Sequence, residues 1–444
     1  MFGLALQTLK FRMGGFLASF IALFFGALIL TACGGLMETG IRTPVSSPEG
    51  EETAGRLISL SAVFGGIAVM VAVFVVGSTL AVLVHQRLRE MALLRAIGCL
   101  PGQIRRMIVG EALVVSAGAL ALALPPGHYA GRWMLGQIAG SGVIAPGTAY
   151  RAGWIPMAAA AGTSLLSAVA AAFIASRRAA LTRPADALAE SLLPGRWLSA
   201  PRLVFALLCL GGGTALAVVT ATVMPADVAA STAGPSAMLW AGGVALIAPG
   251  LTRVLTAVLR GPLRAAGLAG RLAMDNARAR RVQVAGAVTP VMLATGLATA
   301  LIYLQTSQGS GGDGVGAWVN YMLAGTIIGY AVISLVNTLI VAAAERRREF
   351  ALQRLVGAGT GQIMGMMAVE SLLVALIGVI LGTGVALATL TPFTLALDGS
   401  YLPHGPVWIY LAVIGFVGTL TMAATLLPTR YALRARPADA VRVF

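Results

Sequence analysis

Charged residues are scarce in this chain. They make up 11% of its 444 residues, whereas a soluble domain carries about 25%. Lysine is almost absent: Lys10 is the only one, so a Gly-x-x-x-x-Gly-Lys-Ser/Thr phosphate-binding loop cannot be formed. The chain therefore cannot hydrolyse ATP by the route that this loop supports, and its low charge argues against a soluble protein.

Histidine and cysteine are also few, and they are scattered along the sequence. They are His85, His128, His404, Cys33, Cys99 and Cys209. The histidines lack the spacing of metal ligands, and the cysteines form neither a metal pattern nor a disulfide framework. No Gly-x-Ser-x-Gly nucleophile motif occurs. We therefore expect no catalytic residue, no metal site and no cofactor in this chain, and we do not expect it to be an enzyme.

Hydrophobic residues dominate instead, at 58% of the chain with a mean hydropathy of +0.88. They form apolar runs of about 20 residues, the length at which a helix spans a bilayer. We predict an all-α polytopic membrane protein with about ten transmembrane helices. We expect Pro125-Pro126-Gly127 to end the third span, and residues 35–56 to form a polar loop between the first two. The predicted spans lie near residues 15–33, 57–84, 107–124, 155–175, 203–223, 237–258, 284–304, 319–343, 364–390 and 407–427.

The arginines indicate how the chain crosses the membrane. The net charge is +15, but the arginines lie between apolar runs, so they indicate membrane orientation rather than a nucleic-acid partner. With a cytoplasmic N-terminus, almost all arginines fall in cytoplasmic segments, and we predict that both termini are cytoplasmic. The first apolar run is long enough to span the membrane and stay, so we expect no cleaved signal peptide. The predicted outer loops hold only Arg42, Arg56, Arg132 and Arg151.

A ten-residue stretch occurs twice in the sequence. Arg-Glu-Met-Ala-Leu-Leu-Arg-Ala-Ile-Gly at 89–98 matches Arg-Glu-Phe-Ala-Leu-Gln-Arg-Leu-Val-Gly at 348–357. Gly-Gln-Ile follows each copy, at 102–104 and 361–363, and matched positions are 259 residues apart. This agreement of charged residues and glycines in one register indicates an internal duplication.

The duplication extends over most of the chain. Glu111 and Glu370 keep the same register, and an Arg-Pro-Ala-Asp-Ala segment occurs in each half, at 183–187 and 436–440. Because each half has four predicted spans, the two modules run in the same direction, which is the parallel-repeat arrangement. We predict three parts: a first four-span module at 1–202, two linking spans at 203–258 and a second four-span module at 259–444.

The repeated stretch consists of strong helix formers and ends at Gly98 or Gly357, as helices often do. We therefore expect the second and eighth spans to continue out of the membrane as helical stalks. A solvated basic loop that only fixes topology would explain the arginines. It would not explain Glu90, Glu349 or Gly-Gln-Ile in register, whereas a shared docking surface would.

Arg-Glu-x-Ala-Leu-x-Arg-x-x-Gly followed by Gly-Gln-Ile, between two spans, resembles the FtsX/MacB-type permease domain of ABC transporters. The resemblance covers roughly residues 57–190 and 319–444. It implies a permease subunit without a nucleotide site, and a separate cytoplasmic ATPase that carries ATP and Mg²⁺. One chain with two modules would take two ATPase copies. The residues assigned to ATPase coupling by the resemblance are Arg89, Glu90, Arg95, Gly98, Gln103, Arg348, Glu349, Arg354, Gly357 and Gln362.

Two acidic residues lie about one turn inside predicted spans, Glu111 in the third and Glu370 in the ninth. Acids inside a membrane are costly and often functional. Near the cytoplasmic edge they can instead pair with arginine or favour a helix start; Arg105 and Arg106 stand close to Glu111, and Glu370 has no such neighbour in sequence. Both interpretations remain open at this point.

The function that these features predict is ATP-driven export or extraction of an amphiphilic or lipophilic substrate, because the predicted outer loops are short and no outer domain fits in them. An FtsX-like regulator that relays the ATPase state to a partner protein without transport is the alternative. An ion-driven carrier would need acids deeper in the membrane. We expect a multi-pass protein of the cell membrane, in contact with membrane lipids. The bias towards arginine, alanine and glycine favours a bacterial origin.

Overall fold

A computed structural model describes residues 13–86, 94, 98–181, 200–225, 229–265, 267–308, 314–344, 346–403 and 405–434. Every regular element in these ranges is a helix, which confirms the predicted all-α class. The helices are α2 (Met13–Ile41), α3 (Pro48–Gln86), α5 (Pro101–Gly140), α6 (Trp154–Leu181), α8 (Ala200–Thr222), α9 (Ala229–Arg264), α10 (Gly267–Ala279), α11 (Arg281–Gln308), α12 (Gly314–Ala344), α13 (Arg347–Leu355), α14 (Thr360–Asp398) and α15 (Val407–Arg434).

Most of these helices are built to cross a membrane. Within the described residues, nine are long and apolar enough to do so, and a shorter apolar helix, Trp154–Ala170, is the tenth candidate. These helices confirm a polytopic membrane protein with about ten spans. The parallel relation of the two modules and the cytoplasmic position of the termini stay predictions.

The predicted polar loop at 35–56 is wrong, because α2 and α3 extend into it and leave only residues 42–47 between them. Ion pairs between side chains one turn apart support these helix ends: Arg42 lies 2.6 Å from Glu38, and Arg56 lies 2.5 Å from Glu52. Pro48 occupies the first position of α3, where its missing N–H and fixed φ are tolerated. The helices therefore extend beyond the apolar runs that the sequence shows, and these ion pairs lie at the extended ends.

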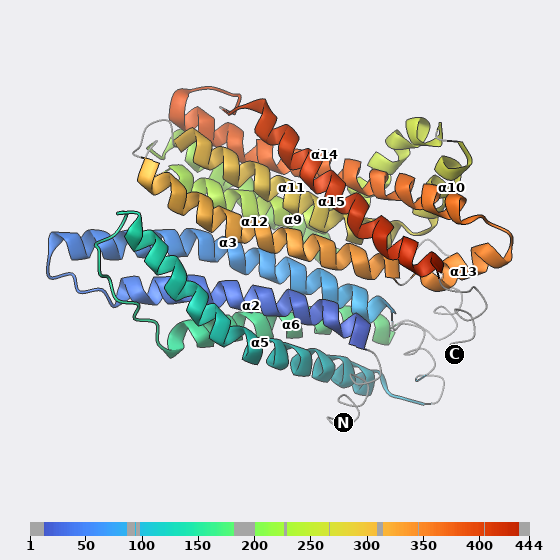
Figure 1. Ribbon diagram of the computed structural model, residues 1–444, viewed down its shortest axis with the longest axis horizontal. Helices are drawn as coiled ribbons and strands as arrows, with labels where there is room; N and C mark the ends of the chain where they lie inside the picture. Colours follow the sequence, from blue (N-terminus) through green and yellow to red (C-terminus); the bar gives the residue numbers. More distant parts are fainter. Residues whose placement is uncertain are drawn as a thin grey trace. The chain divides into compact units, whose positions relative to one another are not determined.

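The prediction that Pro125-Pro126-Gly127 ends the third span is also wrong. α5 continues through both prolines to Gly140, and Figure 1 shows it changing direction along its length. Membrane helices accommodate proline when neighbouring helices support the freed backbone groups. Gly127 lets α5 approach α2 closely at this point, since a Cβ there would lie 2.9 Å from the Leu28 carbonyl oxygen. The proline pair thus bends the helix instead of ending it.

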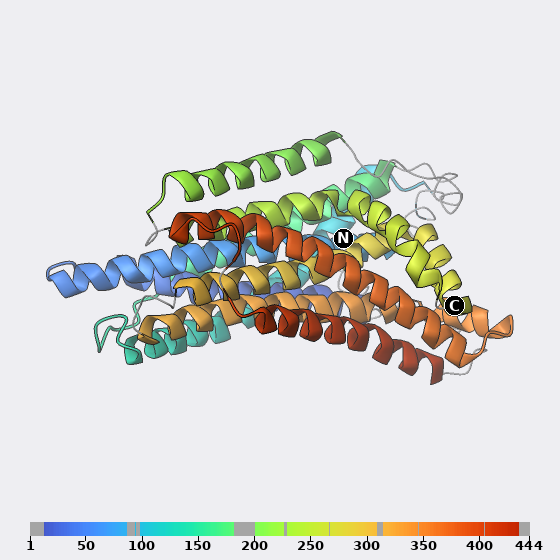
Figure 2. The same ribbon diagram turned by 90° about the horizontal axis from the view of Figure 1, so that it is seen from above.

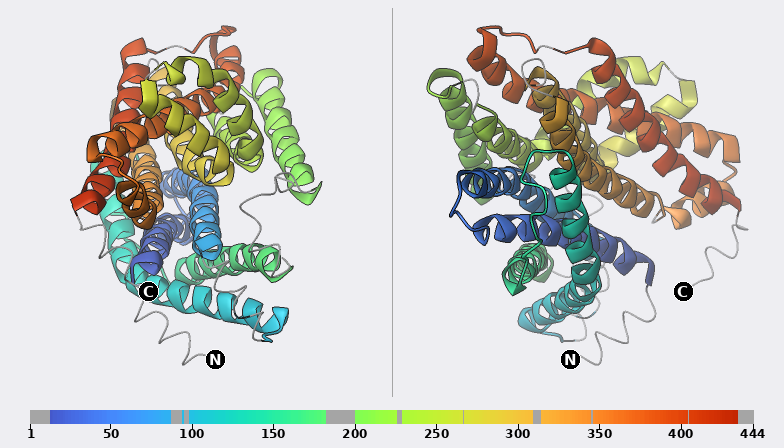
Figure 3. Two further views of the ribbon diagram at one scale, coloured as in Figure 1. Left: turned by 90° about the vertical axis from the view of Figure 1, so that its right-hand side faces the viewer. Right: turned by 60° about the vertical axis from the view of Figure 1, so that its left-hand side comes forward.

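The chain divides into two compact units. The first comprises residues 1–196 and 308–330, and the second comprises residues 197–307 and 331–444, so α12 contributes to both. In the first unit α2 packs on α3, α5 and α6, as Figure 3 shows. Tyr330, from the middle of α12, donates a hydrogen bond to the Ala22 carbonyl oxygen of α2 at 3.1 Å. The predicted boundaries at 202 and 258 stay predictions.

The second unit is organised around α14. This helix packs on α8, α9, α10 and α15, and Figure 2 shows α8 as the helix that flanks α9 at the edge of this unit. It also packs on α11, where Ala300 of α11 shares one buried cluster with Ala386 and Phe393 of α14. Without a strong hydrophobic force between helices in lipid, such close packing holds transmembrane helices together.

Glycines bring one pair of helices into backbone contact in each unit. A Cβ on Gly131 of α5 would lie 3.1 Å from the Ala32 carbonyl oxygen of α2. In the second unit, a Cβ on Gly382 of α14 would lie 2.8 Å from the Met292 carbonyl oxygen and 2.9 Å from the Gly296 nitrogen of α11. The α2–α5 and α11–α14 pairs are therefore held by backbone against backbone, which any larger residue would separate.

The segment between α5 and α6 folds back onto the end of α2. Gly153 donates its N–H to Oε2 of Glu38 at 2.9 Å, and the Tyr150 ring lies 5.0 Å from the His128 ring. The Tyr150 hydroxyl enters the space that Gly35 and Gly131 leave open. Burial, and to a smaller extent the Glu38 carboxylate and Cys33, raise the pKa of Tyr150 to about 12. This segment is fixed by packing and hydrogen bonds despite its irregular backbone.

Candidate functional site: the repeated turn

The two copies of the repeated stretch end in the same turn. Gly98 has a φ of +101° and Gly357 a φ of +102°, a conformation that residues with a Cβ rarely adopt. The N–H of Cys99 donates to the Leu94 carbonyl oxygen at 3.0 Å, and the N–H of Ala358 donates to the Gln353 carbonyl oxygen at 2.9 Å. These bonds close a Schellman-type helix end, so both glycines lie at the helix C-termini that the sequence predicts.

The next helix starts in the same way in both copies. Oε1 of Gln103 accepts the N–H of Leu100 at 3.0 Å, and Oε1 of Gln362 accepts the N–H of Gly359 at 3.0 Å. A side chain at the third helical position that bonds back to the N-cap forms one half of a capping box. The Gly-Gln-Ile element of the repeat therefore fixes the starts of α5 and α14.

The predicted continuous stalk is interrupted in the second copy. α12 ends at Ala344 and α13 begins at Arg347, with Arg346 between them in a turn whose N–H bonds to the Ala343 carbonyl oxygen. The Arg346 side chain at this turn points inward and is only 8% exposed. In the first copy the corresponding stalk residues, including Arg89, Glu90 and Arg95, lie outside the described residues.

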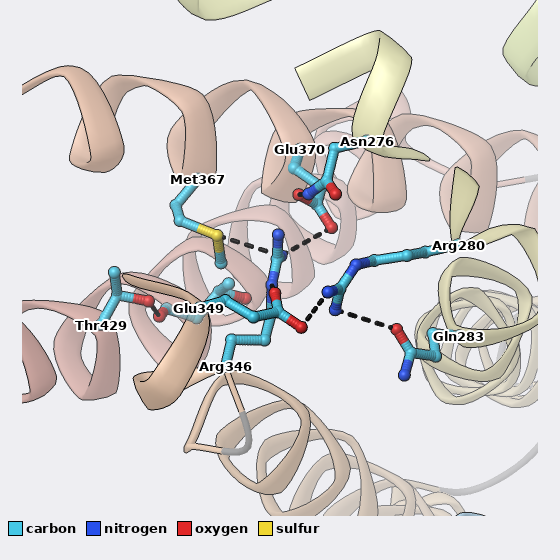
Figure 4. Close-up of polar contacts among 9 residues, drawn as sticks. Asn276, Arg280, Gln283, Arg346, Glu349, Met367, Glu370 and Thr429 are labelled. Atoms are coloured by element: carbon cyan, nitrogen blue, oxygen red, sulfur yellow. Dashed lines mark hydrogen bonds and ion pairs between the residues drawn. The ribbon is translucent and has the colours of Figure 1, made fainter. Parts of the chain in front are cut away.

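Arg346 forms a buried ion pair with Glu370 of α14. Its Nη1 lies 2.8 Å from Oε1 of Glu370, and Nδ2 of Asn276 donates to Oε2 at 3.0 Å (Figure 4). Both carboxylate oxygens thus have a donor, as a buried charge requires. Nη1 of Arg346 also lies 3.1 Å from the Met367 sulfur. In the second copy this pairing accounts for the acid inside the predicted span.

Glu349 extends the network outwards. It forms an ion pair with Arg280, which lies between α10 and α11, and its Oε2 is 3.7 Å from Nε of Arg346. Arg280 also donates to Oε1 of Gln283 at 3.2 Å, so Figure 4 shows a chain of contacts from Gln283 to Glu370. Charged side chains therefore connect α13 to α10, α11 and α14.

The two copies of the turn lie in two segments that match one protein family. The sequence model described as FtsX-like permease C-terminal matches residues 62–184 and 321–437, more than half of the chain, and each match contains one copy of the turn. The chain belongs to the FtsX-like permease family. No curated protein matches the chain in a separate comparison. Membership makes this protein a membrane permease subunit of the ABC transporter type, a class that works with a cytoplasmic ATPase.

Several motif positions of this FtsX-like permease have internal roles. Arg354 donates to the Leu433 carbonyl oxygen in the last turn of α15 at 2.9 Å, where an arginine satisfies a free carbonyl. Phe350 and Ala351 are buried. The Arg348 side chain lies outside the described residues. Residues Glu349 and Arg354, assigned to ATPase coupling by resemblance, thus hold α13 against its own neighbours, and their role in coupling stays a prediction.

The outward face of the permease turn is apolar. Leu352, Leu355 and Val356 are exposed, and Val356 is 90% exposed at the tip. Beside them, a Cβ added at Gly361, or at its counterpart Gly102, would meet no atom within 4 Å in the described part of the chain. The backbone conformation therefore explains Gly357, whereas neither backbone conformation nor packing explains Gly361, although both recur in the repeat.

The sequence did not single out Arg346, Arg280 or Asn276. The positions of the two arginines in the sequence indicate only membrane topology. The partners of Arg346, Arg280 and Asn276 lie 24, 69 and 94 residues away in sequence. One signal was available: Arg87 precedes Glu111 by 24 residues, the same separation as Arg346 and Glu370. Glu111 is buried at 3% exposure and is not without an interaction partner.

Proposed function

We propose that this permease docks a cytoplasmic ATPase on its two repeated turns and couples ATP hydrolysis there to export or extraction of an amphiphilic or lipophilic substrate. The observation that carries the proposal is the exposed apolar tip around Val356, which is joined through α13 to a buried ion pair on α14. A surface for a partner and a connection into the membrane lie in one short segment.

The docking surface is supported by what is exposed. Large apolar side chains at a tip outside the apolar spans have no lipid to cover them, so a protein partner is the occupant that removes them from water. Gly361 adds to this surface, because open space at a repeated glycine permits a partner's backbone to approach closely. The partner contacts are therefore assigned to Leu352, Leu355, Val356 and Gly361.

The connection from the turn to the membrane is supported by the ion-pair network. A displacement of α13 would move Arg346 and Glu349, and through them Glu370 of α14 and Arg280 beside α10. Buried charge pairs resist separation, because each leaves an unpaired charge when broken. α13 and α14 would therefore move together when the ATPase closes.

The duplication supports two ATPase copies for each permease chain. Gly98 and Gly357 have the same backbone conformation, and Gln103 and Gln362 make the same cap. Two equivalent turns would receive two equivalent subunits. ATP and Mg²⁺ would be bound by those subunits, and the permease would provide the substrate's path through the membrane.

The substrate class is supported by the short segments between the predicted outer helix ends, such as 42–47 and 141–153. A substrate that already lies in the membrane reaches the helices from the side, without a large outer domain. Exposed apolar side chains on α8, including Phe205 and Leu208, would let such a substrate contact the protein without leaving an apolar environment. We therefore propose a lipid, a lipopeptide or a drug of similar character.

The experiment is purification of the tagged permease from its native membrane, with the copurifying ATPase activity as the readout. The test variant is Ile97→Asp with Val356→Asp, because Ile97 is the counterpart of Val356 in the sequence repeat. The control is Leu402→Asp, which adds the same charge at an exposed apolar residue between α14 and α15. Glu349→Arg is a poorer probe, because it would also break the internal ion pair with Arg280.

We expect two ATPase copies per chain with the native permease and with the control, and none with the double variant, at an unchanged melting temperature. ATPase binding that survives in the double variant would overturn the docking site. Substrate transfer is tested separately, by reconstituting the complex and following ATP-dependent movement of a fluorescent phospholipid analogue. A bound, active ATPase that moves no lipid analogue would leave the docking site standing and exclude the proposed substrate class.

A further inference from the structure

A cationic cavity lies where the last turn of α9 meets α10. Its volume is about 570 Å³, and it is lined by Gly261, Arg264, Ala265, Arg271 and Asp275. It is separate from the Arg346–Glu370 network and from the repeated turn. We infer that this cavity binds the phosphate headgroup of an anionic phospholipid of the cytoplasmic leaflet.

The donors in the cavity are only partly satisfied internally. Nη2 of Arg264 lies 2.7 Å from Oδ1 of Asp275, which uses one donor of the guanidinium. Nε of Arg264 is buried and has no hydrogen-bond partner among the described residues. Arg271 forms no ion pair among these residues and is exposed at the cavity. Two arginines against one aspartate leave a net positive charge with free N–H groups, the arrangement that suits a phosphate.

Apolar side chains lead from the membrane into the cavity. Val254 and Val258 are exposed on α9, and they precede Gly261 and Ala265 at spacings that place all four on one helix face. A free phosphate would make no use of this stripe. An acyl chain would lie along it and bring its headgroup to the arginines.

α10 has the character of a helix that lies in the membrane interface. Gly270, Ala273 and Ala277 are buried against the unit, while Leu268 and Leu272 are exposed beside Arg271. Exposed leucines next to arginine suit the boundary between acyl chains and headgroups. The positive-inside rule assigns the 260–283 segment to the cytoplasmic side, where anionic lipids attract basic residues. A lipid is therefore the favoured occupant over an acidic protein surface.

The test measures retention of phosphatidylglycerol by the purified full-length permease, compared with phosphatidylcholine, by native mass spectrometry from mixed micelles. The variants are Arg264→Gln with Arg271→Gln, and Arg271→Gln alone. The control is Arg278→Gln, which removes an exposed arginine from the same helix outside the cavity. A melting curve of each variant shows that it is folded, and Arg271→Gln keeps the Arg264–Asp275 pair intact in case the double variant does not fold.

We expect the native chain and Arg278→Gln to retain phosphatidylglycerol preferentially, and the double variant to lose about tenfold or more of this retention. Equal retention in all variants would overturn the inference. Soluble glycerol phosphate is the third probe: if it binds as tightly as the lipid, the cavity is an anion site only. If the variants lose the ATPase but keep the lipid, the arginines belong to the partner's surface. The inference does not depend on the proposed docking turn, because lipid retention is measured without the ATPase.

Discussion

Nη1 of Arg346 and Oε1 of Glu370 lie 2.8 Å apart although the two residues belong to different structural segments, one in the turn between α12 and α13 and the other in α14. Each residue is only 8% exposed. A pair hidden to this degree differs from surface pairs such as Arg56–Glu52, in which water screens both charges. Removing one partner leaves the other charge buried and uncompensated.

Glu370→Ala should therefore destabilise the permease by about 3–5 kcal/mol, the typical cost of breaking a buried pair from one side. Arg346→Met combined with Glu370→Leu should cost less than either single change, because no charge is left behind. Thermal unfolding in detergent, followed by tryptophan fluorescence, measures both. Glu52→Gln is the surface control and should change stability by less than about 1 kcal/mol. A double variant as unstable as the sum of the singles would contradict the structure.

The two glycines around the repeated turn should respond differently to alanine. Gly357→Ala forces a Cβ into a φ of +102° and should cost about 1–2 kcal/mol. Gly361→Ala lies in the first turn of α14 with open space around it, and it should be neutral or stabilising by up to about 1 kcal/mol. Melting temperatures of the two single variants decide the matter. Similar losses for both would show that Gly361 has an internal role that the structure does not display.

Two substitutions of Gln362, which caps the start of α14, distinguish an effect on stability from an effect on ATPase binding. Gln362→Ala removes the acceptor for the Gly359 N–H and should cost about 0.5–1.5 kcal/mol. Gln362→Glu keeps an acceptor and adds a negative charge at a helix N-terminus, where the dipole favours it, so stability should be retained. Both variants are compared in the melting assay and in ATPase copurification. Loss of ATPase binding by Gln362→Glu at unchanged stability would show that the partner contacts the side-chain amide of Gln362.

Gly35 and Tyr150 should behave as an interacting pair. Gly35→Ala places a Cβ against the Tyr150 hydroxyl and should destabilise by about 1–3 kcal/mol through overpacking. Tyr150→Phe should recover part of this loss, since the ring carbon Cζ would still lie 2.9 Å from the new Cβ. Gly136→Ala is the matched control on α5, with no atom within 4 Å among the described residues. An additive double variant would rule out the contact.

The sequence predicts the turn well because its residues act locally. Gly357 needs a particular φ, and Gln362 bonds to a backbone group three residues away, so the motif and the structure contain the same information. The helix count follows from apolar run length for the same reason. Helix ends are less predictable, since α5 continues through Pro125 and Pro126 where it packs closely on α2 at Gly127.

The ion-pair network could not be read from the sequence in the same way. Glu370 has methionines as sequence neighbours and takes its partners from Arg346 and Asn276, which a different element supplies in each case. Periodicity shows which residues share a helix face, but it does not show which face meets which neighbour. The duplicated spacing of Arg87 and Glu111 is the one feature of the sequence that points to such a pair.

The glycine contacts within each unit have a mechanical consequence. With backbone against backbone at Gly131 and Ala32, α2 and α5 leave no layer of side chains that could reorient and let one helix slide along the other. Gly382 and Gly296 impose the same restriction on α11 and α14. We therefore expect each helix pair to move as one rigid unit. Distances between spin labels placed within one helix pair should stay constant when ATP is added to the complex with the ATPase. Each pair would then be an internal reference against which the motion of every other helix can be measured.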